Sequence, residues 1–92
     1  MRKYSEDEIL KEISEYVDKT YGAHYSVGSV QTLDLIESVG DAKAVCRSNI
    51  LKYASRYDKK GTARKDIIKI IHYGMLLLHF NDKHDSNYET HN

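Results

Sequence analysis

Proline is absent from this 92-residue sequence, and its absence constrains the fold more than any other feature. Without proline, helical segments must be ended by glycine, by turns and by capping residues. Gly22, Gly40 and Gly61 lie between segments whose apolar residues recur at helical spacing. The sequence therefore predicts an all-α fold: a small helical domain with an antiparallel helical hairpin.

The apolar spacing predicts four helices, over about residues 5–19, 30–39, 41–57 and 63–80. Asp41 is expected to cap the third helix. The turn after that helix contains Gly61 and is short, which makes the third and fourth helices antiparallel neighbours. The residues expected to pack inward from the third helix are Ala44, Val45, Leu51 and Ala54.

A chain of this length forms one domain, which we assign to residues 1–80. Residues 81–92 are polar and lack an apolar period, so we predict that they form a disordered tail. The apolar residues of the fourth helix occupy more than one stripe, and three other short helices offer little to cover it. We therefore expect a homo-oligomer through residues 63–80.

No segment of the sequence predicts a membrane partner. The N-terminus is charged and lacks the apolar core of a signal peptide. The longest apolar run, Met75-Leu76-Leu77-Leu78, is far shorter than a membrane span. We expect a cytosolic protein.

The net charge of zero conceals a strong asymmetry. Residues 41–73 carry nine Lys or Arg against three Asp, a net charge of +6, and the rest of the chain carries −6. Such asymmetry favours an anionic partner for the basic segment. The alternative is that these residues are ordinary solvated helix faces.

One face of the third helix carries the most informative side chains. Asn49, Lys52, Tyr53 and Arg56 follow at i, i+3, i+4 and i+7, and therefore share a face over two turns. Arg and Lys bind phosphate oxygens, and Tyr can stack on a base or donate from its hydroxyl.

The fourth helix repeats this geometry with Asp66, Lys69 and Tyr73. Arg56 and Asp66 should lie near each other across the hairpin, either as a structural ion pair or as ligand-binding residues. For Tyr53 and Tyr73 the alternative is semi-buried packing. A loop histidine and tyrosine, His24-Tyr25, add a candidate acid, base or phosphate donor.

Motifs of the common nucleotide-binding folds are absent: the sequence contains neither a P-loop nor a G-x-G-x-x-G fingerprint. It also lacks a cysteine or histidine pattern that would hold a metal ion through protein ligands.

Several short motifs resemble one known family. His24-Tyr25 with Gly28, Leu33-Asp34-Leu35-Ile36-Glu37, Asn49-Ile50-Leu51-Lys52-Tyr53 with Arg56, Lys60-Gly61, and Asp66 with Lys69 and Tyr73 are similar, in order and spacing, to the SaV-like family of small bacteriophage proteins. The resemblance covers residues 24–73. Ser48 stands where the family pattern has glycine.

This resemblance implies a nucleotide-binding protein in the cytoplasm of a bacterial host. The family includes a nucleotide kinase that acts on deoxynucleoside monophosphates, so Mg²⁺ and ATP are implied only if the chain is a kinase. The other interpretation is a sponge that sequesters a nucleotide, including a signalling nucleotide of antiviral defence.

The implied ligand is a nucleotide or another phosphorylated small molecule, bound by His24, Tyr25, Asn49, Lys52, Tyr53, Arg56, Lys60, Asp66, Lys69 and Tyr73. The alternative function is a nucleic-acid-binding or regulatory module that uses the basic hairpin. The acidic remainder of the chain argues against strong binding to duplex DNA.

Overall fold

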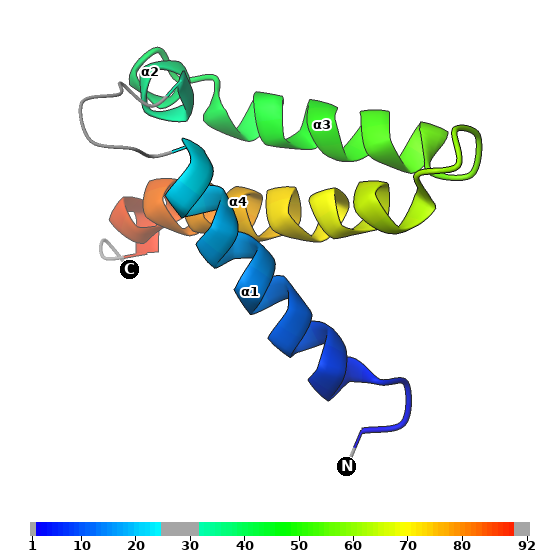
Figure 1. The fold of residues 1–92 in the computed structure, drawn as a ribbon. Helices are drawn as coiled ribbons and strands as arrows, with labels where there is room; N and C mark the ends of the chain where they lie inside the picture. Colours follow the sequence, from blue (N-terminus) through cyan, green and yellow to red (C-terminus); the bar gives the residue numbers. More distant parts are fainter. Residues whose placement is uncertain (1, 25–31, 90–92) are drawn as a thin grey trace. The chain divides into compact units, whose positions relative to one another are not determined.

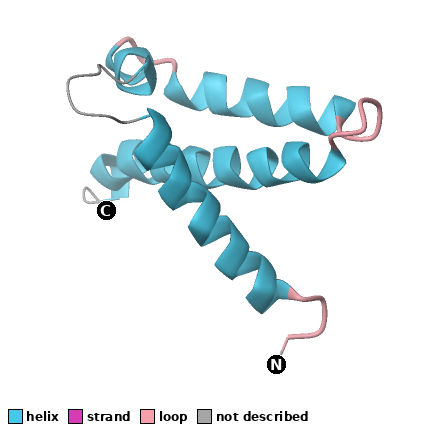
Figure 2. Ribbon diagram, in the orientation of Figure 1, coloured by secondary structure: helices cyan, strands magenta, loops and turns pink. Residues whose placement is uncertain are grey.

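The computed structural model describes residues 2–24 and 32–89, and every regular element in them is a helix (Figures 1 and 2). The helices are α1 (Glu6–His24), α2 (Thr32–Ser38), α3 (Ala42–Arg56) and α4 (Ala63–Glu89). The predicted all-α class is confirmed. The chain divides into two units, Met1–Gln31 and Thr32–Asn92.

The first unit contains α1, whose first turn holds Glu6, Asp7 and Glu8. Negative charges at this position are stabilised by the positive end of the helix dipole. The helix continues through Gly22 to His24, so the expected end at residue 19 is wrong. A glycine inside a helix destabilises the helix by only about 1 kcal/mol relative to alanine, and the favourable helical preference of the neighbouring residues can offset this loss.

The second unit is built on the hairpin of α3 and α4, which lie side by side and antiparallel, as predicted (Figure 1). Gly61 has a φ of +70°, a left-handed conformation that favours glycine. The turn is tied at both ends, because Lys59 N–H donates to Arg56 C=O at 2.9 Å and Asp66 N–H donates to Thr62 C=O at 3.0 Å.

The core of this unit lies between the two helices. Ala42 and Cys46 from α3 are buried with Phe80 from α4. Partly buried apolar side chains pack against them: Leu33, Tyr73, Leu76 and Leu77. The free thiol of Cys46 is completely buried, and this burial raises its pKa.

The inward face of α3 differs from the predicted one. Its buried residues are Ala42, Cys46 and Tyr53. Ala44, Leu51 and Ala54, which we expected to pack inward, are exposed. The sequence of α3 alternates small, charged and apolar residues with little preference for one face, so its contacts with α4 decide which side is buried.

Helix α2 is joined to α3 by a turn at Gly40, which has a φ of +86°. Gly40 N–H donates to Glu37 C=O at 2.9 Å and Asp41 N–H donates to Ile36 C=O at 3.1 Å, satisfying carbonyls at the end of α2. Asp41 occupies the N-cap position of α3, but its side chain makes no capping hydrogen bond, contrary to our expectation.

Helix α4 extends to Glu89, so the predicted helix end at Phe80 is wrong and residues 81–89 are helical. The added segment contains neither proline nor glycine, and nothing in its sequence interrupts the backbone hydrogen bonding. Lys83 in this extension pairs with Glu37 of α2, with 2.9 Å between Nζ and Oε2. Over the described residues, no helix is both long and apolar enough to cross a bilayer.

Candidate anion-binding site

Tyr53 is the centre of a group of positively charged side chains between α3 and α4. Its side chain is buried, with 7% of the residue exposed. Three cations lie over its ring: Lys52 Nζ is 5.0 Å, Arg56 Cζ 4.8 Å and Lys69 Nζ 5.1 Å from the ring centroid. All three distances are within the range of cation–π attraction. We call these three side chains the cation cluster.

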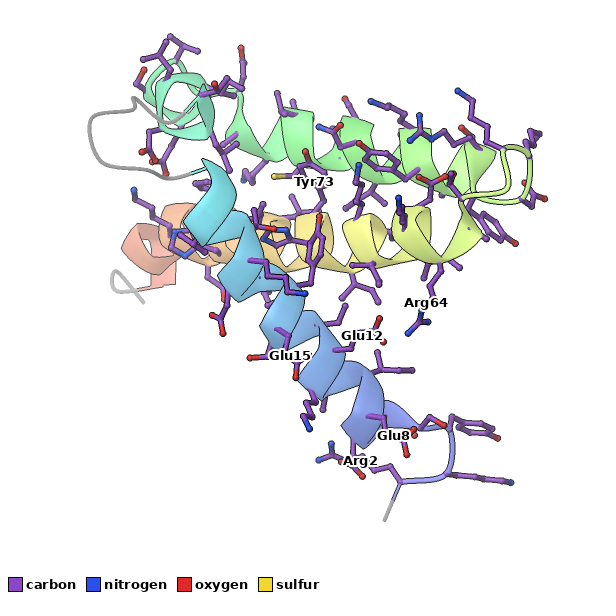
Figure 3. All side chains as sticks on the ribbon, in the orientation of Figure 1. Arg2, Glu8, Glu12, Glu15, Arg64 and Tyr73 are labelled. Atoms are coloured by element: carbon purple, nitrogen blue, oxygen red, sulfur yellow. The ribbon has the colours of Figure 1, made fainter. Side chains whose placement is uncertain are left out.

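Tyr73 of α4 supports the same group from the other helix. Its ring stacks on that of Tyr53, with 6.1 Å between centroids and 18° between planes. The label in Figure 3 marks Tyr73 on α4. Because the Tyr53 ring is buried and already in contact with cations and with Tyr73, it orients the cation cluster and leaves little ring area for a base.

The guanidinium of Arg56 is also held in place by a buried carboxylate, that of Asp66. Its Nε and Nη2 atoms donate to Asp66 Oδ2 and Oδ1 at 3.3 and 3.1 Å, a two-point contact that fixes the guanidinium plane. Asp66 is 1% exposed and accepts a further hydrogen bond from Thr62 Oγ1 at 3.2 Å. The ion pair across the hairpin, one of the two sequence interpretations, is therefore formed.

This pairing changes the proton affinity of both groups. The hydrogen bonds from Arg56 lower the pKa of Asp66, against the opposing effect of burial, and Thr62 and the charges of Arg56 and Lys69 add to the lowering. The hydrogen bond to Asp66 likewise raises the pKa of Arg56. Both groups are therefore charged at neutral pH.

The charges of the group do not balance. Within the described part of the chain, three cations gather around one ring, and one of them, Arg56, is paired with the carboxylate of Asp66. Lys52 is exposed and Lys69 is partly exposed, so their ammonium groups can be reached from solvent. An arrangement with about two unbalanced positive charges attracts an anion of matching charge.

The remaining predicted residues are more dispersed. Asn49 lies on the same face of α3, where its Nδ2 donates to Val45 C=O at 3.0 Å. Lys60 is exposed in the turn between α3 and α4. His24 ends α1 in the other unit, and Tyr25 lies outside the described residues. Six of the ten predicted residues thus come together directly: Lys52, Tyr53, Arg56, Asp66, Lys69 and Tyr73.

Ser48, at the position where the SaV-like pattern has glycine, does not crowd this group. Its side chain is exposed, and its Oγ donates to Ala44 C=O at 2.8 Å along the same helix. A side chain larger than that of glycine is therefore tolerated at this position, because it lies on the solvent-exposed side of α3.

A second basic feature was not singled out from the sequence. Lys43 and Arg47 of α3 line a shallow open pocket of about 280 Å³ together with Leu77 of α4. Lys43 is nine residues before Lys52, about two and a half helical turns, and so lies on roughly the opposite side of α3. The i, i+4 spacing of Lys43 and Arg47 was the available sequence signal.

Within the described part of the chain, no group of three or more His, Cys, Asp or Glu side chains is placed to hold a metal ion.

The match to known proteins covers this site. Residues 19–74 match the profile of a family described as a protein of unknown function, DUF3310. The matched segment is more than half of the 92 residues and contains the cation cluster, Tyr53, Tyr73 and Asp66. Neither the curated proteins nor the solved structures contain a match to the chain.

Proposed function

The chain belongs to the DUF3310 family of proteins of unknown function, and from this premise we propose that it is a bacteriophage nucleotide-binding protein. The observation that carries the proposal is the cation cluster, three cations within about 5 Å of one buried tyrosine ring, of which Arg56 is paired with the carboxylate of Asp66. The resemblance of residues 24–73 to the SaV-like family supports both the phage source and the nucleotide.

In this proposal Lys52, Lys69 and Arg56 bind the phosphate group. Lysine ammonium groups act as mobile point charges, and the guanidinium of Arg56, fixed by Asp66, offers its remaining N–H groups in a set direction. Tyr53 holds the cations in position, and Tyr73, which is partly exposed, lies nearest to a sugar or base. The bacterial host cytoplasm supplies such ligands.

The state of Asp66 favours binding without turnover. Both of its oxygens accept hydrogen bonds from Arg56, one also from Thr62, and its pKa is lowered. A carboxylate with a lowered pKa and occupied oxygens is a poor general base. Among the two implied roles we therefore favour sequestration of a nucleotide over a nucleotide kinase that would use Mg²⁺ and ATP.

Calorimetry with mono-, di- and cyclic nucleotides tests this function on native protein and on two folded variants. Lys52→Ala removes one charge-assisted contact, worth about 1.5–3 kcal/mol, and should weaken binding roughly tenfold to a hundredfold. Lys43→Ala is the matched control, because it removes the same charge from the opposite side of the same helix and should leave the affinity within about twofold.

If no nucleotide binds, or if both variants bind as tightly as the native protein, the proposed site is wrong. Incubation with ATP, a deoxynucleoside monophosphate and Mg²⁺ separates the two roles, since a diphosphate product would establish the kinase.

A nucleic-acid interface is the second candidate, because Lys43 and Arg47 extend the basic surface to the far side of α3. Binding through many phosphates falls steeply as salt rises, whereas a small site responds less. The nucleic-acid interface would replace the nucleotide proposal if the protein bound only polynucleotides and its affinity fell steeply with salt. Lys43→Ala and Lys52→Ala should then lose affinity equally.

A further inference from the structure

The side chain of Tyr53 has two parts with different surroundings. Its ring is in contact with the cation cluster and with Tyr73, and only 7% of the residue is exposed. Its hydroxyl has no hydrogen-bond partner among the residues that the structure describes. The contacts within the hairpin therefore account for the ring of this residue but not for its hydroxyl.

The hydroxyl of Tyr53 lies at the surface of the hairpin. In the described part of the chain, every fully buried polar side-chain atom has a hydrogen-bond partner. Because the Tyr53 hydroxyl has none there, it is not fully buried, and the small exposed fraction of the residue includes its oxygen. A tyrosine this deeply buried ordinarily pairs its hydroxyl within the protein. Water can take the place of that partner, and a ligand that displaces the water must form the same hydrogen bond.

The charges around the ring decide which kind of ligand fits. The ammonium groups of Lys52 and Lys69 can be reached from solvent and lie 5.0 and 5.1 Å from the ring centroid. The guanidinium of Arg56 lies at 4.8 Å, and its two hydrogen bonds to Asp66 fix its plane. A hydroxyl donor surrounded by positive charge favours a negatively charged oxygen acceptor.

We propose that the Tyr53 hydroxyl donates a hydrogen bond to an oxygen of the phosphate group that the cation cluster binds. This assignment rests on the proposed function and gives Tyr53 a second role, since its ring positions the cations and its hydroxyl binds the ligand. Lysine side chains are mobile point charges, whereas a hydroxyl on a buried ring is a donor in a fixed place. Tyr53 is therefore a specificity-determining residue that sets where the phosphate oxygen lies.

Tyr53→Phe isolates the hydroxyl, because it keeps the ring that stacks on Tyr73 and attracts the cations. Calorimetry with inorganic phosphate and with the same nucleotides should show an affinity lowered about tenfold or more, the loss expected for a hydrogen bond to a charged group. The Tm of the ligand-free variant should stay within about 2 °C of the native value, since the hydroxyl loses no partner in the described hairpin.

Tyr57→Phe is the matched control. It makes the same chemical change four residues later, at a tyrosine that is 40% exposed, ends α3 and lies outside the cation cluster. The affinity of this variant for phosphate and for nucleotides should stay within about twofold of the native value.

Nuclear magnetic resonance of the native protein reports on the hydroxyl itself. The protein is labelled at tyrosine Cζ, the carbon that bears the hydroxyl, and the resonance missing from Tyr53→Phe belongs to Tyr53. This resonance should shift as inorganic phosphate is added, with the same Kd as in calorimetry. The resonance of Tyr57 should not move.

The outcomes separate this contact from the proposed function. If nucleotides bind Tyr53→Phe as tightly as the native protein, or if the Tyr53 resonance stays in place at saturating phosphate, the hydroxyl makes no contact and the site itself stands. A native protein that binds phosphate but no nucleotide overturns the proposed function alone, and the phosphate titrations then decide the role of Tyr53. A native protein that binds neither overturns both.

Discussion

Asp66 carries its charge in a position where water reaches almost none of its surface. It is stabilised there by two hydrogen bonds from Arg56 and one from Thr62, and the described buried side chains leave no polar atom without a partner. A buried carboxylate is tolerated only when it is paired and hydrogen-bonded in this way, since an unpaired one would lose its hydration and gain no interaction in its place. The hairpin and the cation cluster therefore depend on the same residue.

Asp66→Asn should destabilise the protein, lowering Tm by roughly 10 °C or more, because Arg56 keeps its charge and loses its partner. The pH dependence should change as well. Since the pKa of Asp66 in the folded protein lies below its ordinary value of 3.8, its stabilising effect is complete above 3.8 and is lost as the pH falls below that value.

Urea unfolding of both proteins between about pH 7 and about pH 3 measures this difference, and the native protein should lose more stability on acidification than Asp66→Asn. Parallel pH profiles would show that the Arg56–Asp66 pair does not contribute to acid sensitivity.

At the scale of helices, the sequence was most informative where local chemistry decides the structure. The hairpin was predictable because Gly61 and the charged residues around it form a turn between two helical segments, and a short turn makes those segments neighbours. The proximity of Arg56 and Asp66 was predictable for the same reason. They stand on either side of the turn, and a tight turn brings such residues close together across the hairpin.

The sequence was less informative where tertiary contact decides. Leu51 was expected inside and is exposed, while Tyr53 and Cys46 are buried. Every side of α3 carries a mixture of residue types, so the contacts with the side chains of α4 decide which side of α3 is buried. The helical end of α4 was missed because a polar segment without apolar spacing can still be helical when it continues an existing helix.

Substitutions of Gly61 test the turn directly. Gly61→Ala should destabilise the protein by about 1–2 kcal/mol, since its φ of +70° is unfavourable for a residue with Cβ. Space is not the cause, because a Cβ at this position would meet no atom within 4 Å. Gly61→Asn is the matched variant and should lose less, as asparagine tolerates this conformation.

Denaturant unfolding of the three proteins gives the comparison. Equal stability of Gly61→Ala and native protein would mean that the turn does not hold the left-handed conformation in solution.

Across the whole molecule, the neutral total charge divides into a basic segment of +6 and an acidic remainder of −6. Repulsion within the basic segment opposes folding, and an anion bound at the cation cluster relieves part of it. A ligand that binds only the folded state stabilises it by about 2.7 kcal/mol at a concentration of one hundred times its Kd.

Saturating inorganic phosphate should therefore raise Tm by roughly 10 °C relative to chloride at the same ionic strength. Differential scanning fluorimetry provides the measurement, and Lys52→Ala should show a smaller rise than Lys43→Ala. A rise of the same size in chloride would attribute the effect to general screening of charge.

The short turn between α3 and α4 also has a kinetic consequence. Residues that meet across the hairpin, such as Arg56 and Asp66, are separated by few positions in the chain, and contacts between nearby positions require little loop closure. Helical proteins rich in such contacts fold in microseconds to milliseconds. The hairpin should therefore form early, and the pairing of Glu37 with Lys83, which are much farther apart in the sequence, should follow it.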